Sequence, residues 1–90
     1  MSDLNKLYNF YNLNESTVGQ SVKVINILDN CDPYYRQRLL AQGVVPGAIM
    51  QIKKIAPLGD PIELLLSSGR SFIVRKNEAR IIRVVKLDLC

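Results

Sequence analysis

The side chains that could carry acid–base or nucleophilic chemistry are few and scattered. The 90-residue chain contains no histidine, the side chain whose ordinary pKa lies nearest neutral pH. Asp32 precedes a proline as a helix cap would, Asp60 lies in a turn-like segment, and Glu63 occupies the outward phase of an expected strand. Acid–base catalysis needs positioned titratable groups, and a nucleophile needs an adjacent base. The sequence shows neither arrangement and predicts a protein that is not an enzyme.

The residues that could bind a metal or a phosphate are equally sparse. Cys31 and Cys90 are distant in sequence and form no Cys-x-x-Cys pair, and without histidine two separated thiols make a poor metal cage. Gly69-Arg70 does not match a phosphate-binding Gly-x-x-x-x-Gly-Lys loop. The sequence therefore favours free thiols and assigns no catalytic, cofactor-binding or metal-binding residue.

Basic residues are concentrated in the second part of the chain. The net charge is +4, and six basic residues fall in the last third: Arg70, Arg75, Lys76, Arg80, Arg83 and Lys86. Small barrels that hold nucleic acid combine such a basic face with stacking aromatic side chains. There is no tryptophan, Phe72 lies at an inward phase, and the four tyrosines fall within the first 35 residues. A solvated basic face is the favoured interpretation, and a barrel that binds nucleic acid or another regulatory protein is the alternative.

Apolar alternation and turn residues predict five strands and one helix. Asp32 followed by Pro33 is a helix-start signal, and Gly43 can supply the left-handed conformation that ends a helix. Leu39 and Leu40 are expected to face the core. The expected strands cover residues 21–28, 48–55, 62–66, 72–74 and 81–87, and the helix covers 33–42.

Turn chemistry joins the later strands. Pro46-Gly47 suits the central positions of a type II turn, and Ser68-Gly69 suits a hairpin. The apolar phase reverses at Lys54-Ile55, as it does at a β-bulge. Asn77-Glu78-Ala79 is expected to form one short helical turn.

The N-terminal segment carries a different pattern. Four apolar residues recur at helical spacing: Leu4, Leu7, Tyr8 and Tyr11. This stripe predicts an N-terminal extension over 1–17 that contains a short amphipathic helix, preceding a domain over 18–90. The helix either covers one end of the domain, which is the favoured interpretation, or is exposed for a partner.

Five short strands in so short a chain favour a closed, mainly β fold. An open sheet would leave exposed edges, and closure into a small barrel removes them. The predicted fold is a small five-stranded barrel with one short α-helix after the first strand. No apolar run approaches the length of a membrane span, and the first residues do not match a secretory signal, so we expect a cytoplasmic protein.

Three spaced blocks of motif residues follow one another along the chain. The first is Tyr-Arg-Gln-Arg-Leu-Leu at 35–40 with Gly43 and Pro46-Gly47 after it. The second is the proline-bounded loop at 55–62, and the third is Phe-Ile-Val-Arg-Lys at 72–76 with the segment that follows it. Together they extend over roughly 21–85, and in composition and order they resemble the FeoA family of bacterial ferrous-iron uptake proteins.

The resemblance implies an SH3-like barrel that supports a membrane Fe²⁺ transporter. Its expected partner is the cytosolic GTPase-containing region of that transporter, FeoB. The protein is expected to meet the membrane only indirectly, through the transporter, and to bind no nucleic acid. Family descriptions attach transition-metal binding to the domain, so weak Fe²⁺ association is compatible with the resemblance, although dedicated ligands are missing. The helix and the 57–61 loop are the predicted partner surface, with Arg36, Arg38, Leu58 and Asp60 as its contact residues.

Overall fold

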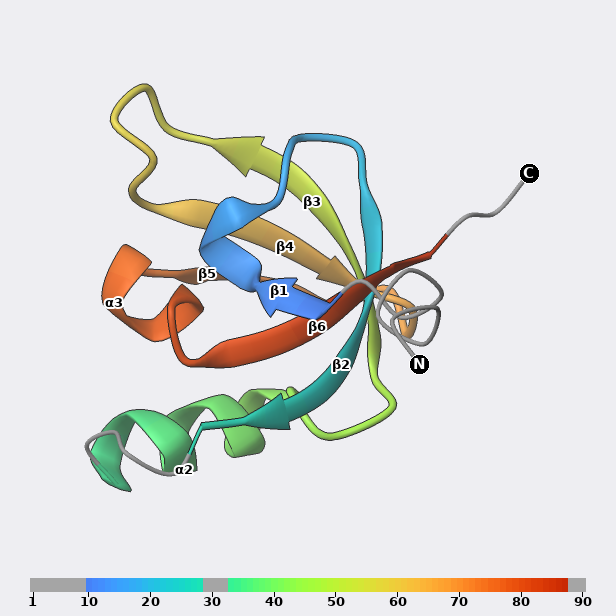
Figure 1. Ribbon diagram of the computed structural model, residues 1–90, viewed down its shortest axis with the longest axis vertical. Helices are drawn as coiled ribbons and strands as arrows, with labels where there is room; N and C mark the ends of the chain where they lie inside the picture. The colour runs from blue at the N-terminus through green and yellow to red at the C-terminus, as the bar shows by residue number, and fades with distance from the viewer. Residues whose placement is uncertain (1–9, 29–32, 88–90) are drawn as a thin grey trace, which may run out of the picture.

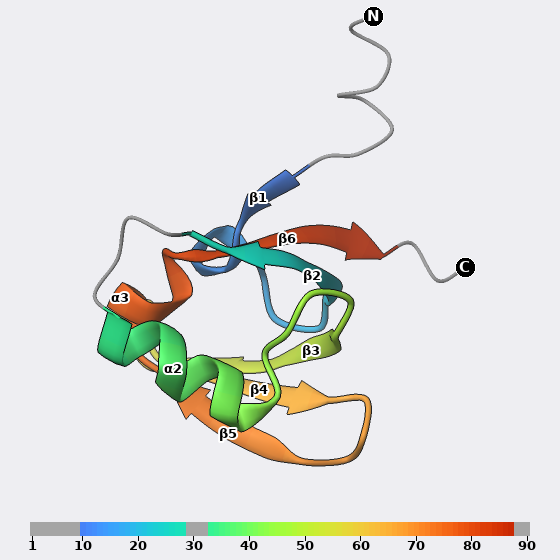
Figure 2. The same ribbon diagram turned by 90° about the horizontal axis from the view of Figure 1, so that it is seen from below.

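The structure, a computed structural model, describes residues 10–28 and 33–87. The elements in chain order are β1 (Phe10–Asn12), the 3₁₀ turn η1 (Leu13–Glu15), β2 (Ser21–Ile27), α2 (Pro33–Gln42), β3 (Ile49–Ile55), β4 (Ile62–Leu66), β5 (Ser71–Val74), α3 (Lys76–Ala79) and β6 (Ile82–Leu87). One sheet holds all the strands in the order β1-β6-β2-β3-β4-β5, and every pairing is antiparallel. The sheet curls on itself, with α2 and α3 lying at one end (Figures 1 and 2).

The mainly β fold and the position of the helix are confirmed, whereas the described residues contain six strands instead of five. The additional strand is β1, in which Tyr11 pairs with Val84 of β6. Tyr11 therefore does not belong to a helix, because pairing along the edge of β6 overrides the weak helical pattern. The remaining residues of the predicted stripe, Leu4, Leu7 and Tyr8, lie outside the described residues.

The folded unit also begins earlier than residue 18. Leu13, in η1, is completely buried in the core, and the Asn12 backbone N–H donates to Glu15 Oε1 at 3.0 Å. This back-bond satisfies a donor that the start of a helix leaves unpaired. Residues 10–17 thus contribute a strand and a core side chain.

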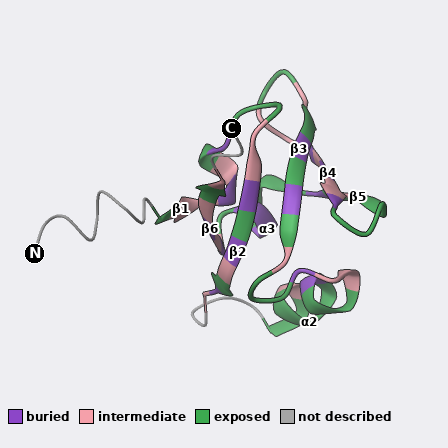
Figure 3. Ribbon diagram, turned by 90° about the vertical axis from the view of Figure 1, so that its right-hand side faces the viewer, coloured by how far each residue is buried: buried purple, intermediate pink, exposed green. Residues whose placement is uncertain are grey.

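The core follows from the period of two along each strand. Successive side chains of a strand point to opposite faces, so alternate residues enter the interior. In β4, Ile62, Leu64 and Leu66 are buried while Glu63 and Leu65 are partly exposed. Figure 3 shows the same alternation as bands of buried and exposed residues along β2 and β3.

The sheet curls without closing by hydrogen bonds. Among the described residues, β1 pairs only with β6 and β5 pairs only with β4, so these two strands form the edges. The sequence argument that closure removes the edges is therefore wrong in this detail. Short edge strands of three and four residues are one of the ways in which proteins limit unwanted edge pairing.

The helix is found over the predicted range and contributes one large side chain to the core. Leu39 is buried, and its carbonyl accepts the Val44 backbone N–H at 3.0 Å, but Leu40 is 40% exposed. The expectation that Leu40 faces the core is therefore wrong. Adjacent residues are about 100° apart around a helix axis. The narrow face of α2 that contacts the core therefore includes Leu39 and not Leu40.

The predicted turns and the bulge are confirmed. Ala48 N–H donates to the Val45 carbonyl at 2.9 Å around Gly47, whose φ is +91°. The register of β3 against β4 shifts between Ile52 and Lys54. The β4–β5 hairpin closes through the Leu66 N–H and the Arg70 carbonyl at 2.8 Å.

Gly43 is the glycine whose replacement we expect to cost the most. Its φ is +100°, and a Cβ there would lie 3.3 Å from Leu66 Cδ1. We predict that Gly43→Ala lowers the free energy of unfolding by about 2 kcal/mol, since the left-handed conformation alone costs roughly 1–2 kcal/mol. Gly47→Ala is the matched control, because its φ is +91° and no atom lies within 4 Å of the added Cβ. Equal losses in urea unfolding would contradict the steric part of this prediction.

Candidate functional site

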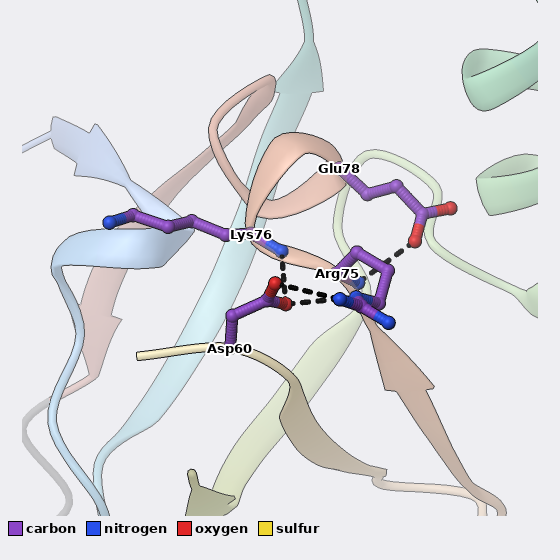
Figure 4. Close-up of polar contacts among 4 residues, drawn as sticks. All are labelled: Asp60, Arg75, Lys76 and Glu78. Atoms are coloured by element: carbon purple, nitrogen blue, oxygen red, sulfur yellow. Dashed lines mark hydrogen bonds and ion pairs between the residues drawn. The ribbon is translucent and has the colours of Figure 1, made fainter. Parts of the chain in front are cut away.

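The loop between β3 and β4 is fastened to α3 by one carboxylate (Figure 4). Asp60 Oδ1 accepts from Arg75 Nε at 3.0 Å, and Asp60 Oδ2 accepts from Arg75 Nη2 at 3.0 Å. The Lys76 backbone N–H also donates to Asp60 Oδ1, at 2.9 Å. Lys76 is the first residue of α3, where the backbone N–H has no partner within the helix. Asp60 thus caps a helix that begins sixteen residues later in the chain, while pairing bidentately with Arg75.

A second carboxylate extends this network to α2. Glu78 is 1% exposed; its Oε1 accepts the Arg75 backbone N–H at 2.9 Å, and its Oε2 lies 3.2 Å from Arg38 Nη1. Figure 4 shows Glu78 and Asp60 on either side of Arg75. A buried charge is costly unless it is paired and hydrogen-bonded. Glu78 therefore ties the position of α2, through Arg38, to the start of α3.

The electrostatics of the fastening favour the charged forms of both partners. The hydrogen bond from the Arg75 side chain is the main cause that lowers the pKa of Asp60, and the Lys76 backbone N–H adds to it. The same hydrogen bond raises the pKa of Arg75. Because the Arg75 side chain is 66% exposed, solvent screens the pair. Its main effect is to orient the loop.

Leu58 lies in the middle of the fastened loop. The loop is closed at its base by the Ala56 N–H to the Pro61 carbonyl at 3.1 Å and within by the Gly59 N–H to the Ala56 carbonyl at 2.7 Å. Leu58 itself is 89% exposed, so it is a large apolar side chain presented to solvent by a hydrogen-bonded loop. An apolar residue held out in this way gains by contact with another surface.

An apolar groove of about 460 Å³ lies beside this loop. Its lining includes Pro57 from the loop, Ile55 from β3, Ile73 from β5 and Val18 from the turn before β2. Val18 and Ile73 are 58% and 54% exposed. The turn is held against β3 by the Gly19 N–H to the Ile52 carbonyl at 2.8 Å, which brings Val18 to the groove. Four segments, the loop, β3, β5 and the turn before β2, therefore build one aliphatic hollow.

The bulge in β3 supplies the basic rim of the groove. At a bulge two residues face one on the partner strand, so the strict alternation of sides is lost locally. Lys53 and Lys54 are accordingly both exposed, and both line the groove. Lys53 Nζ lies 3.6 Å from Glu63 Oε2, whereas Lys54 has no ion-pair partner within the described part of the chain.

The structure links two of the four sequence-predicted contact residues. Arg38 and Asp60 join through Glu78 and Arg75, so both have intramolecular roles in addition to any external one. Leu58 lies on the loop that forms one wall of the groove. Arg36 is exposed on α2 and is not among the groove-lining residues that the structure describes.

Sequence reasoning missed several residues that build the site. The roles of Arg75 and Glu78 were not predicted, because their partners are distant in sequence. A glutamate near the start of a short helical turn is nevertheless a capping signal. Ile73 directly follows Phe72, which lies at an inward phase, so Ile73 falls at an outward one. A large apolar residue at such a position is a signal for a contact surface. Val18 had no signal, because the fold of a turn brings it to the groove.

The described residues offer no metal cage. Within residues 10–28 and 33–87, no three histidine, cysteine, aspartate or glutamate side chains lie close enough together to hold a metal ion. Cys31 and Cys90 lie outside these ranges. Within the same ranges, no helix has the length and apolar character that crossing a membrane requires.

Comparison with known proteins identifies the family. A model of the FeoA domain matches residues 11–86, which is most of the chain. The chain belongs to the FeoA family. This family is associated with ferrous-iron transport, so the resemblance in the three sequence blocks is confirmed.

Two solved structures of FeoA proteins share the fold along nearly their whole length. A FeoA-like protein from Clostridium acetobutylicum is 37% identical, with a TM-score of 0.78 over 90% of this chain and 91% of that one. An iron uptake regulatory protein (FeoA) is 32% identical, with a TM-score of 0.74 over 87% and 97% of the two chains.

A third structure confirms the SH3-like fold. It is the zinc complex of FeoA from Stenotrophomonas maltophilia, described as an SH3 domain protein, with 24% identity and a TM-score of 0.72 over 82% of this chain and 88% of that one. At this identity the likeness concerns the fold alone.

The stability contributed by Asp60 should depend on pH with a defined sign. Its folded pKa lies below the unfolded value, so the contribution is complete above the unfolded pKa of about 3.9 and is lost as pH falls through the folded pKa. We predict that Asp60→Asn is less stable than the native chain at about pH 6 and that the difference shrinks below about pH 4. Urea midpoints across this range measure the effect, and a pH-independent difference would contradict it.

Glu78 should contribute more to stability than an exposed acid does. We predict that Glu78→Ala lowers the free energy of unfolding by about 2–3 kcal/mol, because a half-exposed Arg38 and a partly buried backbone N–H of Arg75 lose their partner. Glu63→Ala is the control and should cost under about 1 kcal/mol, since its pair with Lys53 is long and solvent-screened. Similar losses for both variants would contradict the assigned role of Glu78.

Proposed function

We propose that this FeoA protein is a non-catalytic accessory protein of ferrous-iron uptake. In this proposal it acts in the cytoplasm by docking to the GTPase-containing region of the membrane Fe²⁺ transporter FeoB. Fe²⁺ is the cargo of the transporter, and the barrel acts by surface contact without a tightly bound cofactor. Membership of the FeoA family supports the iron-transport setting.

The docking role is supported mainly by a rigid apolar surface beside the loop that Asp60 bonds to α3. Leu58 is almost fully exposed, and the groove next to its loop is lined largely by aliphatic side chains and prolines. Binding costs less when the contact residues are already held in place. The Asp60 contacts with Arg75 and Lys76 supply that order to the loop.

Two chemical features of the surface favour a protein partner over nucleic acid. Sequence-independent nucleic-acid grooves combine basic residues with aromatic stacking platforms. The side chains that line this groove include no aromatic residue, and one of its two lysines is paired with Glu63. An aliphatic hollow with one available cation suits a polypeptide surface that is apolar and locally acidic.

The direct test is capture of the purified cytosolic GTPase-containing region of FeoB. We expect a stoichiometric complex, together with no salt-dependent retention of RNA or DNA. Retention of nucleic acid without the transporter region would overturn the proposal and favour the alternative of a nucleic-acid-binding barrel.

Leu58 should matter for binding and not for folding. We predict that Leu58→Asp weakens capture of the transporter region about tenfold or more, because a charged group would have to be buried in an apolar contact. Its unfolding midpoint should stay within experimental error of the native value, as the native side chain is 89% exposed. Val45→Asp, at another exposed apolar residue, is the control and should bind normally. Equal weakening by both variants would contradict a specific role for the loop.

A further inference from the structure

The free edge of β5 adjoins the apolar groove. β5 pairs with β4 on one side, and within the described residues it has no strand on the other. Ile73, at the middle of this edge, lines the groove and is 54% exposed. In Figure 2, β5 is the outermost strand on the side away from β1 and β6. A strand edge and an apolar hollow therefore lie together.

The register identifies which backbone groups face outward. Leu66 and Arg70 form a hydrogen-bonded pair at the hairpin, through the Leu66 N–H and the Arg70 carbonyl. Such pairs alternate with non-hydrogen-bonded ones along an antiparallel ladder. Phe72 opposite Leu64 therefore bonds to β4, while Ile73, opposite Glu63, directs its N–H and carbonyl away from β4. The outward groups of Ile73 can pair with an added strand.

A second hollow flanks the same edge on the side of α2. It measures about 470 Å³ and is lined by Arg38 and Gln42 from α2, by Glu63 from β4, and by Ser71, Phe72 and Ile73 from β5. Side chains of an added strand would alternate between two faces. One face would meet the aliphatic groove and the other the polar hollow. The two surroundings call for alternating apolar and polar side chains in the added strand.

The charges of the two hollows fix the polar chemistry of the occupant. Lys54, at the rim of the groove, has no ion-pair partner among the described residues. Arg38 engages Glu78 through Nη1, and its side chain remains 46% exposed in the second hollow. Glu63 also lines both hollows, but its carboxylate is paired with Lys53. Lys54 and Arg38 are therefore the charges that favour carboxylates on an incoming segment.

We propose that the free edge of β5 binds an extended polypeptide segment of a partner protein in which apolar residues alternate with acidic ones. The segment joins the sheet as an additional strand, placing an apolar side chain in the groove and carboxylates near Lys54 and Arg38. This is β-strand addition and not polyproline recognition, which uses aromatic-lined grooves. It rests on the proposed function only in naming the FeoB region as the source of the segment.

Ile73→Pro is the decisive variant. Proline removes the outward N–H that an added strand needs, and the native ladder does not use that N–H, so the fold should be kept. Ile73→Val is the matched control, because it keeps the N–H and a β-branched side chain. Amide hydrogen exchange in β4 verifies that the native ladder persists.

The first measurement uses a library of random twelve-residue peptides and does not depend on FeoB. We expect enriched peptides to alternate apolar and acidic residues, and to bind Ile73→Pro at least tenfold more weakly than Ile73→Val. Lys54→Glu should also weaken binding, while Lys86→Glu, at an exposed lysine on β6, should not. Recovery of proline-rich peptides, of no peptide, or of peptides that bind Ile73→Pro normally would overturn the inference.

The second measurement uses the FeoB region and separates the two proposals. Loss of binding by Ile73→Pro alone would support strand addition. Normal binding by Ile73→Pro would overturn strand addition and leave the docking function standing. Absence of binding by the native chain would overturn the docking function, and the peptide selection would then decide strand addition. A native dimer that Ile73→Pro dissociates would overturn the assignment to a partner, because a second copy of the chain would occupy the edge.

Discussion

The buried carboxylate of Glu78 is the constraint on which the arrangement of the site depends. It binds the backbone of Arg75 and the side chain of Arg38, so it fixes where α3 begins relative to α2. Arg75 then extends its guanidinium to Asp60. Because the chain of contacts passes through a buried charge, displacing any member leaves another polar group without its partner. A small domain thereby gains local rigidity that its modest core would not supply.

The same constraint explains how surface chemistry is held in place. The loop that displays Leu58 has few apolar contacts of its own, and Asp60 anchors it to α3 through three hydrogen bonds. The groove beside it is built from the loop, from β3 and β5, and from the turn that contains Val18. A docking surface composed of distant segments can be pre-formed when each segment is bonded to the sheet or to a helix. That property suits an accessory protein whose role is contact and not catalysis.

Irregularities in the sheet, more than its regular parts, give the surface its character. The bulge after Ile52 exposes two successive lysines, and the unpaired side of β5 presents the backbone of Ile73. In a fully closed barrel the edge would be absent, and in a regular strand one of the lysines would face inward. Fold similarity to other FeoA proteins therefore describes the frame, whereas the local departures decide which chemistry this chain offers.

The sequence by itself determined the elements whose causes are local. The range of α2 follows from Pro33 and Gly43, the turn into β3 follows from Pro46-Gly47, and the β4–β5 hairpin follows from Ser68-Gly69, because proline and glycine have distinctive backbone preferences wherever they occur. Strand periodicity identified the inward faces. The tertiary structure alone decided the pairing of β1 with β6, the exposure of Leu40, and the bonding of Asp60 to Arg75. These depend on which distant segments meet, and a one-dimensional pattern does not carry that information. Acidic and basic side chains that are far apart in the sequence form one hydrogen-bonded network in the fold, and this network holds the contact surface in place.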